Sequence, residues 1–375
     1  MQIPQIPLLT LEFVKYPMPN RIDFAATFVA KSENTLQLLQ ELTRARNAFI
    51  PLLINNDDPY KLAKAVSDYL EKFVPFANTI STKKELKTVN LLQFHWTSAL
   101  ERDKTIRYMF YSYWFEIAMC NVLLGCANVN CAKRVLTREN IRDRSIEGIE
   151  KYHILAATAF LSAKNISMDN WSAKNEARLP VDLRSEILEN IAQYFLGQAQ
   201  IWMVISGFTK EAYSIAGGNA FFVEKCAENI KKALQADIEF MANGDQGLFD
   251  FFCVQEIVCY AISCYANALD MQKRIVIEIL NADLTLGKIL KFAECATQAL
   301  SILFKEEHFE MYRQHVAGFT QMCKDLHAKY QKEVNESKFQ ENIPTELPKR
   351  QIAKQMLLFQ TEETKVTENK YGVDL

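Results

Sequence analysis

Apolar residues along this chain recur mainly at the three- and four-residue spacing of amphipathic helices. Between 106 and 124, one predicted helix face carries Ile106, Phe110, Trp114, Ile117 and Leu124. Further helices are predicted over 22–48, 58–75, 83–100, 137–166, 183–206, 209–240, 248–280 and 287–334. Because these helices are long and their connections are short, successive helices should pack antiparallel, as in a bundle or solenoid.

The placement of proline supports a mainly helical chain. There is no proline between Pro180 and Pro344, and proline breaks the interior turns of a helix. A stretch of that length without proline is best filled with helices. Thr82 followed by Glu85 has the spacing of a capping box, which predicts the start of another helix.

The two ends of the chain have a different pattern. Leu9, Leu11 and Phe13 alternate with polar residues, which is typical of a half-buried strand and predicts a small N-terminal sheet. The sequence does not identify the partner strands. Residues 361–375 are polar and aperiodic, and we expect them to form a loose tail.

Composition places the chain among ordinary globular proteins. Hydrophobic residues make up 49%, charged residues 23%, and the formal net charge is -2. That balance gives no global electrostatic reason to expect nucleic acid as a partner. No run approaches the roughly 18 consecutive apolar residues of a membrane-spanning helix, and the first residues do not resemble a signal peptide.

The nine cysteines lie mostly within apolar stretches. Buried free thiols are common in reducing compartments, so the sequence favours an intracellular protein. Two sets share the same spacing, namely Cys120, Cys126 and Cys131, and Cys253, Cys259 and Cys264. Helix positions 11 residues apart are separated by about 16 Å, too far to share one zinc ion. We expect core thiols.

Motifs for catalysis or metal binding are weak. The sequence contains no Walker loop, GxGxxG, HExxH, GxSxG or CxxC, so nothing in it argues for an enzyme or for a cofactor. Glu150 and His153 form a Glu-x-x-His pair, but di-iron bundles need two such pairs and two further glutamates. We therefore expect no metal site, and a surface or groove-lining pair.

Several short stretches, in the right order, resemble the Bro-one domains of the ALIX-like family. They are Ile6-Pro7-Leu8, Gln93–Ala99 with its Phe-x-Trp-x-Ser pattern, Phe115-Glu116-Ile117-Ala118 with Asn121, Gly148-Ile149 leading to Ala156–Phe160, and Gly197–Gln200. Near the end of the chain, seven residues follow the spacing of the family's C-terminal arm: Asn335, Phe339, Ile343, Pro344, Ile352, Lys354 and Leu357. The resemblance spans residues 6 to about 359.

The resemblance implies a mainly α fold over residues 1–360, a boomerang-shaped solenoid of TPR-like helical hairpins with a small N-terminal β-sheet. It also implies a protein-binding adaptor and no enzyme. The concave face of such domains binds the C-terminal amphipathic helix of an ESCRT-III filament subunit, of the charged multivesicular body protein 4 class. Recognition of this kind places the apolar anchors of a helix in a groove. The implied location is the cytoplasm, with peripheral association with endosomal membranes.

The resemblance also implies the groove positions. Apolar character is kept at Ile149, Met203, Ile215 and Leu357, while Glu150 and Ser206 stand where the family carries lysines. Losing two cations should weaken contact with an acidic helix.

The pair Gly217-Gly218 replaces a Lys-Leu of the family, and it could instead mark a helix break. Ile149, Met203 and Ile215 would also suit a solenoid core.

Two readings of the function stay open. One is the ESCRT adaptor. The alternative is a diverged helical scaffold that binds a different peptide, in a surface, adhesion or phagocytic trafficking complex. Family members often continue into a V-shaped domain and a proline-rich tail, so the 375 residues can be a piece of a longer protein or a short standalone member.

Overall fold

The computed structural model describes residues 6–7, 9, 11–13, 15–55, 58–82, 92–137, 146–170, 179–277, 282–336 and 343–350. These residues form two compact units. The N-terminal unit comprises mainly Leu11–Phe195 and Ala233–Asp245, and the C-terminal unit comprises mainly Leu196–Lys232 and Gln246–Leu358. The predicted mainly helical fold with a small sheet is confirmed. The boomerang outline and the single domain over 1–360 stay predictions.

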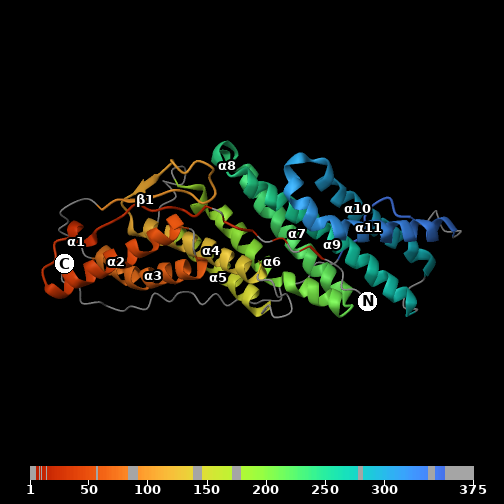
Figure 1. The fold of residues 1–375 in the computed structure, drawn as a ribbon, viewed down its shortest axis with the longest axis horizontal. Coiled ribbons are helices and arrows are strands. Elements are labelled where there is room, and N and C mark those ends of the chain that lie inside the picture. The colour runs from red at the N-terminus through yellow and green to blue at the C-terminus, as the bar shows by residue number, and fades with distance from the viewer. Residues whose placement is uncertain are drawn as a thin grey trace. The chain divides into compact units, whose positions relative to one another are not determined.

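Long helices build both units (Figure 1). The N-terminal unit holds α1 Phe24–Thr27, α2 Glu33–Asn55, α3 Pro59–Thr82, α4 Tyr113–Thr137, α5 Ile146–Asn170 and α8 Ile238–Asn243. The C-terminal unit holds α9 Gln246–Val276, α10 Ala282–Lys305 and α11 Glu310–Glu336. Two more helices, α6 Ser185–Thr209 and α7 Tyr213–Ala236, include residues of both units.

Helices that follow one another in the sequence pack against each other. Short connections predict this for each pair below except α3 and α4, which are joined by residues 83–112. In the N-terminal unit α2 packs on α3, α3 on α4 and α4 on α5; in the C-terminal unit α9 packs on α10 and α10 on α11. The core between them is apolar and aromatic. In one cluster Phe73 of α3 contacts Phe24, Phe76 and Phe94, with ring centroids 5.6, 6.0 and 6.0 Å apart.

The sheet forms at a place the periodicity assigned to helices. Strand β1 Phe94–Trp96 pairs antiparallel with β2 Tyr108–Phe110, so the predicted helices over 92–100 and 106–112 are wrong. Phe94 and Trp96 are both buried with His95 between them, the alternation of a strand, but three residues are too few to stand out in a helical pattern. Helix α4 begins only at Tyr113.

The predicted N-terminal strand is not a strand in the described residues, although its alternating burial is correct. Leu9, Leu11 and Phe13 are buried and Glu12 is exposed. The side chain of Asn130 in α4 takes the place of a partner strand for Phe13. Asn130 Oδ1 accepts the Phe13 N–H at 2.8 Å, and Asn130 Nδ2 donates to the Phe13 carbonyl at 2.8 Å.

Predicted helix boundaries fail where a side chain caps the backbone. The helix predicted over 22–48 is divided into α1 and α2, since the Ser32 hydroxyl accepts the Thr35 N–H at 3.2 Å. The helix predicted over 287–334 is interrupted after Lys305. There Arg313 Nε and Nη2 donate to the carbonyls of Leu303 and Glu306, both at 3.0 Å, which satisfies the end of α10.

Thr82 was predicted to be the N-cap of a new helix, and this prediction is wrong. Thr82 is the last residue of α3, and Glu85 lies outside the described residues. The loose tail predicted over 361–375 lies outside them as well. All nine cysteines are free, as predicted, and Cys253 and Cys295 are only partly buried.

Two helices, α4 and α9, are long and apolar enough to span a membrane by length and composition. Their most apolar windows are 89% and 67% buried inside the protein, however, which is the environment of core helices. Burial also governs the thiols of these helices. It raises the pKa of Cys131 in α4 and of Cys264 in α9 to about 12, so neither is a reactive thiolate at neutral pH.

Candidate protein-binding surface

The end of α6 and the start of α7 come together in the C-terminal unit. Gly207 lies so close to α7 that an added Cβ would be 2.8 Å from the Ala216 Cβ. The turn between the helices is tight because Glu211 adopts a left-handed φ of 53°, and because the Ala212 N–H donates to the Gly207 carbonyl at 2.7 Å.

This contact places three of the predicted groove residues on adjoining helices. Met203 and Ser206 lie on α6 and are partly exposed, and Ile215 lies in the first turn of α7 with 49% of its surface exposed. The side chain of Ile215 therefore reaches solvent next to the helix that carries Met203.

The two glycines of α7 lie inside the helix and are buried, so the alternative of a helix break is wrong. An added Cβ at Gly217 would be 2.9 Å from Asn267 Nδ2 and 3.3 Å from the Ala266 Cβ, both on α9. The glycine lets α7 approach α9 closely. This packing gives a physical reason for the loss of the larger Lys-Leu pair that the resemblance leads one to expect.

The other predicted groove residues lie elsewhere. Ile149 and Glu150 are on α5 in the N-terminal unit, where Ile149 is 8% exposed and Glu150 is partly exposed. Leu357 lies outside the described residues. The grouping of these positions into one groove therefore stays a prediction.

His153 is part of the core and not a surface residue, so that expectation for the Glu150–His153 pair is wrong. Its ring stacks on Phe195, with centroids 5.9 Å apart and planes at 17°. Burial lowers the pKa of His153 to about 3, which keeps the imidazole neutral. Within the described residues no group of three or more side chains could hold a metal ion.

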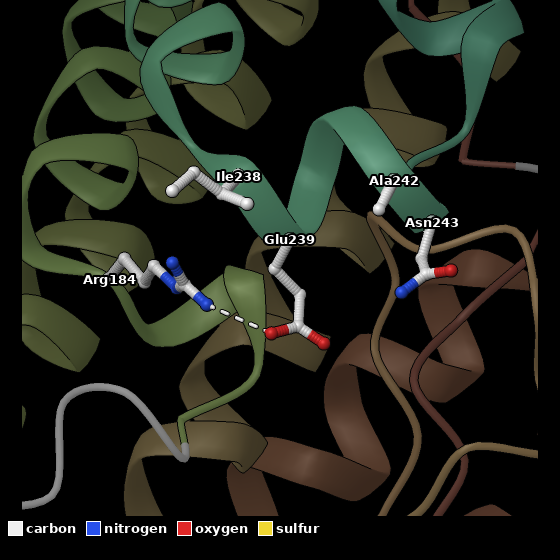
Figure 2. A pocket seen from close by; sticks show the side chains of 5 residues that line it. All are labelled: Arg184, Ile238, Glu239, Ala242 and Asn243. Atoms are coloured by element: carbon white, nitrogen blue, oxygen red, sulfur yellow. Dashed lines mark ion pairs between the residues drawn. The ribbon is translucent and has the colours of Figure 1, made fainter.

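A surface pocket of about 350 Å³ lies beside α8 in the N-terminal unit, lined by Arg184, Ile238, Glu239, Ala242 and Asn243. Figure 2 shows Arg184 pointing toward Glu239, with Ile238 and Ala242 on the same helix. Arg184 Nη1 also binds Asp237 Oδ2 at 2.5 Å.

The two carboxylates offset the guanidinium charge, and the lining holds no cysteine, serine or histidine. This pocket was not predicted from the sequence. Asp237 is the N-cap of α8, and its carboxylate accepts the Phe240 N–H at 2.8 Å.

A buried carboxylate joins two of the stretches that carry the family resemblance, both in the N-terminal unit. Glu116 of α4 accepts hydrogen bonds from Arg46 Nε at 2.8 Å, from Trp96 Nε1 at 2.7 Å and from the Tyr69 hydroxyl at 3.2 Å. Arg46 and Glu116 are fully buried. The Phe-x-Trp and Phe-Glu motifs are thus parts of one structural network, inaccessible to a partner or substrate.

Long stacked helices with one short two-stranded sheet define a Bro1-like fold, and solved structures match it over nearly the whole chain. A structure described as "ALIX BRO1 CHMP4C complex" has a TM-score of 0.69 at 14% identity, covering 96% of this chain and 98% of that one. A structure described as "Structure basis for endosomal targeting by the Bro1 domain" has a TM-score of 0.68 at 13% identity, covering 92% and 91%.

A longer ALIX structure, in complex with the SIVmac239 PYKEVTEDL late domain, has a TM-score of 0.68 at 14% identity, covering 92% of this chain and 48% of that chain. No family model and no curated protein matches the sequence. The chain therefore has the fold of a Bro1 domain, and at this level of identity the likeness establishes the fold alone.

Proposed function

We propose that this protein is a non-catalytic adaptor that binds an amphipathic helix of an ESCRT-III subunit, of the CHMP4 class, through the face formed by the end of α6 and the start of α7. The proposal includes action in the cytoplasm, with peripheral association with endosomal membranes. The observation that carries it is the full-length likeness to a Bro1 domain solved with CHMP4C. The exposed Ile215 on α7 and the partly exposed Met203 on α6 support it.

The side chains of this face are better suited to bind the apolar side of an amphipathic helix than its charged side. Ile215 and Met203 offer two apolar contacts on adjoining helices, which is the arrangement that anchors at i, i+3 and i+4 require. Ser206 contributes a neutral hydroxyl where the resemblance places a lysine. Binding should accordingly rest on apolar burial, with little dependence on salt.

Fluorescence polarisation with a labelled C-terminal helix of CHMP4C tests the proposal. Micromolar binding is expected, equivalent to about 8 kcal/mol. Ile215→Asp and Met203→Asp should each weaken it at least tenfold, because a carboxylate would have to be buried against the helix. Met311→Asp is the matched control, since Met311 is an apolar residue of α11 with 71% exposure. No binding by a folded wild-type protein would contradict the proposal.

The second candidate is a diverged scaffold that binds a different peptide. It is favoured by Glu150, an acid where the resemblance places a lysine, and by the buried glycines of α7. If Glu150 repels the acidic helix, Glu150→Lys should tighten CHMP4C binding several-fold, and a basic amphipathic helix should bind the wild type more tightly than CHMP4C does. The candidate loses its support if Glu150→Lys binds CHMP4C as tightly as the wild type does and if the wild type binds the basic helix no more tightly than CHMP4C.

A further inference from the structure

The C-terminal unit holds an arginine side chain in a preformed aromatic and acidic setting. We call the described segment 343–350 the strap; it has no helix or strand and ends at Arg350. Arg350 Nη2 donates to Glu224 Oε1 at 2.9 Å, and Nη1 binds the other carboxylate oxygen, Oε2. The guanidinium also lies 4.1 Å from the ring centroid of Phe221 and 4.5 Å from that of Tyr260.

These contacts bury both charges. The Arg350 and Glu224 side chains are 8% and 6% exposed. A planar guanidinium forms two parallel bonds to a carboxylate and stacks on aromatic rings, which an ammonium cannot do in the same way. Removing one partner of such a pair would leave an uncompensated buried charge. The setting is therefore selective for arginine over lysine.

The residues that surround the Arg350 guanidinium lie on packed helices, so their positions do not depend on the strap. Phe221 and Glu224 lie on α7 and Tyr260 lies on α9. Lys225, next to Glu224, is paired with Glu228 at 2.5 Å, so this lysine does not compete for the Glu224 carboxylate.

The strap itself is held at few other points. The side-chain hydrogen bonds known for its described residues are made by Arg350. Thr345, Glu346 and Lys349 are exposed, while Ile343, Pro344, Leu347 and Pro348 are partly buried. Simple release of the strap would leave Glu224 buried without a cation, which is costly. Exchange is different, because an arginine from a peptide that takes the place of Arg350 restores the ion pair.

We propose that Phe221, Glu224 and Tyr260 form an arginine-binding pocket of which Arg350 is the exchangeable occupant within the chain. An arginine-bearing peptide and the strap then compete for the same carboxylate and rings. While the strap is bound, its high effective concentration keeps a free peptide out. This pocket is independent of the proposed ESCRT-III contact, since it uses none of the residues assigned to that contact.

The first test measures binding of a fluorescein-labelled octapeptide with the sequence of residues 343–350 to the full chain. Arg350→Ala should bind this peptide at least tenfold more tightly than the wild type, since its pocket is empty. Adding Glu224→Gln to Arg350→Ala, or replacing the peptide's arginine by lysine, should each weaken binding at least tenfold. Equal binding by wild type and Arg350→Ala, or equal binding of the two peptides, would overturn the proposal.

A second test needs no variant and so avoids any loss of folding. Hydrogen–deuterium exchange of the wild type is measured with millimolar ethylguanidinium or ethylammonium. Ethylguanidinium should speed exchange in the strap by displacing Arg350, while ethylammonium at the same concentration should have no effect. Identical exchange in the two solutions would contradict an exchangeable arginine site.

Discussion

Glu116 is the acceptor at which four elements of the N-terminal unit meet. Arg46 comes from α2, Tyr69 from α3 and Trp96 from β1, while Glu116 itself is on α4. Burial and the neighbouring Glu116 raise the pKa of Tyr69 well above its ordinary value, so the phenol stays a neutral donor. The carboxylate is fully surrounded by donors, which is the condition under which a buried charge is tolerated.

Arg46→Met should lower the free energy of unfolding by about 3–5 kcal/mol, because it leaves the Glu116 carboxylate buried without its cation. Urea denaturation measures this change. The matched control is Lys72→Met, which removes an exposed ion pair with Glu41 and should cost less than about 1 kcal/mol. Similar losses for the two variants would show that the buried network is not a main source of stability.

His153 makes stability depend on pH in a predictable direction. Its folded pKa of about 3 lies below the ordinary value of 6.5, so between these values only the unfolded chain takes up the proton. The stability contributed by the neutral ring is thus present above pH 6.5 and is lost as pH falls toward 3, by about 1.4 kcal/mol per pH unit.

A His153→Leu variant lacks this titration. Thermal unfolding followed between pH 7 and pH 5 should therefore show a smaller loss of stability in the variant, by about 2 kcal/mol over the interval. Parallel pH profiles of variant and wild type would mean that the folded imidazole is protonated near neutral pH.

At the scale of elements, one amide of α4 makes both side-chain hydrogen bonds to the backbone of Phe13 in the N-terminal segment. Asn130→Leu removes both bonds to the Phe13 backbone, and the burial of unpaired polar groups costs roughly 1–3 kcal/mol each. We expect faster hydrogen exchange at the Phe13 amide and little change in α4. Asn121→Leu, which breaks only a bond to the Ile117 carbonyl within the helix, is the control and should leave the exchange of Phe13 unchanged.

Elements with long periodic patterns were predictable from the sequence, and short ones were not. The helices α3, α6, α7 and α9 fall where apolar spacing predicts them. Strand β1 was missed because its alternation covers only Phe94, His95 and Trp96, which is too short a run to stand out from the helical pattern around it. The break before α11 was missed because it depends on Arg313 binding carbonyls of α10, a contact made only in the folded chain.

For the molecule as a whole, solved Bro1 structures share the fold at only 13–14% sequence identity. This is possible because a helical solenoid needs apolar residues at given spacings but tolerates many choices of apolar side chain. The candidate site was less predictable. Sequence alone could not place Ile215 in solvent and Gly217 against α9, because burial depends on neighbouring helices. The arginine pocket joins residues more than a hundred positions apart, Glu224 and Arg350, and no local pattern marks it.

The central claim is that a CHMP4-class helix lies on the face formed by the end of α6 and the start of α7. Photo-crosslinking tests it most directly, with benzoylphenylalanine at position 215 or, as control, at position 311, and with the C-terminal helix of CHMP4C as ligand. The account predicts a cross-linked product at 215 that unlabelled helix competes away, and none at 311. Cross-linking at neither position, or equally at both, would contradict it.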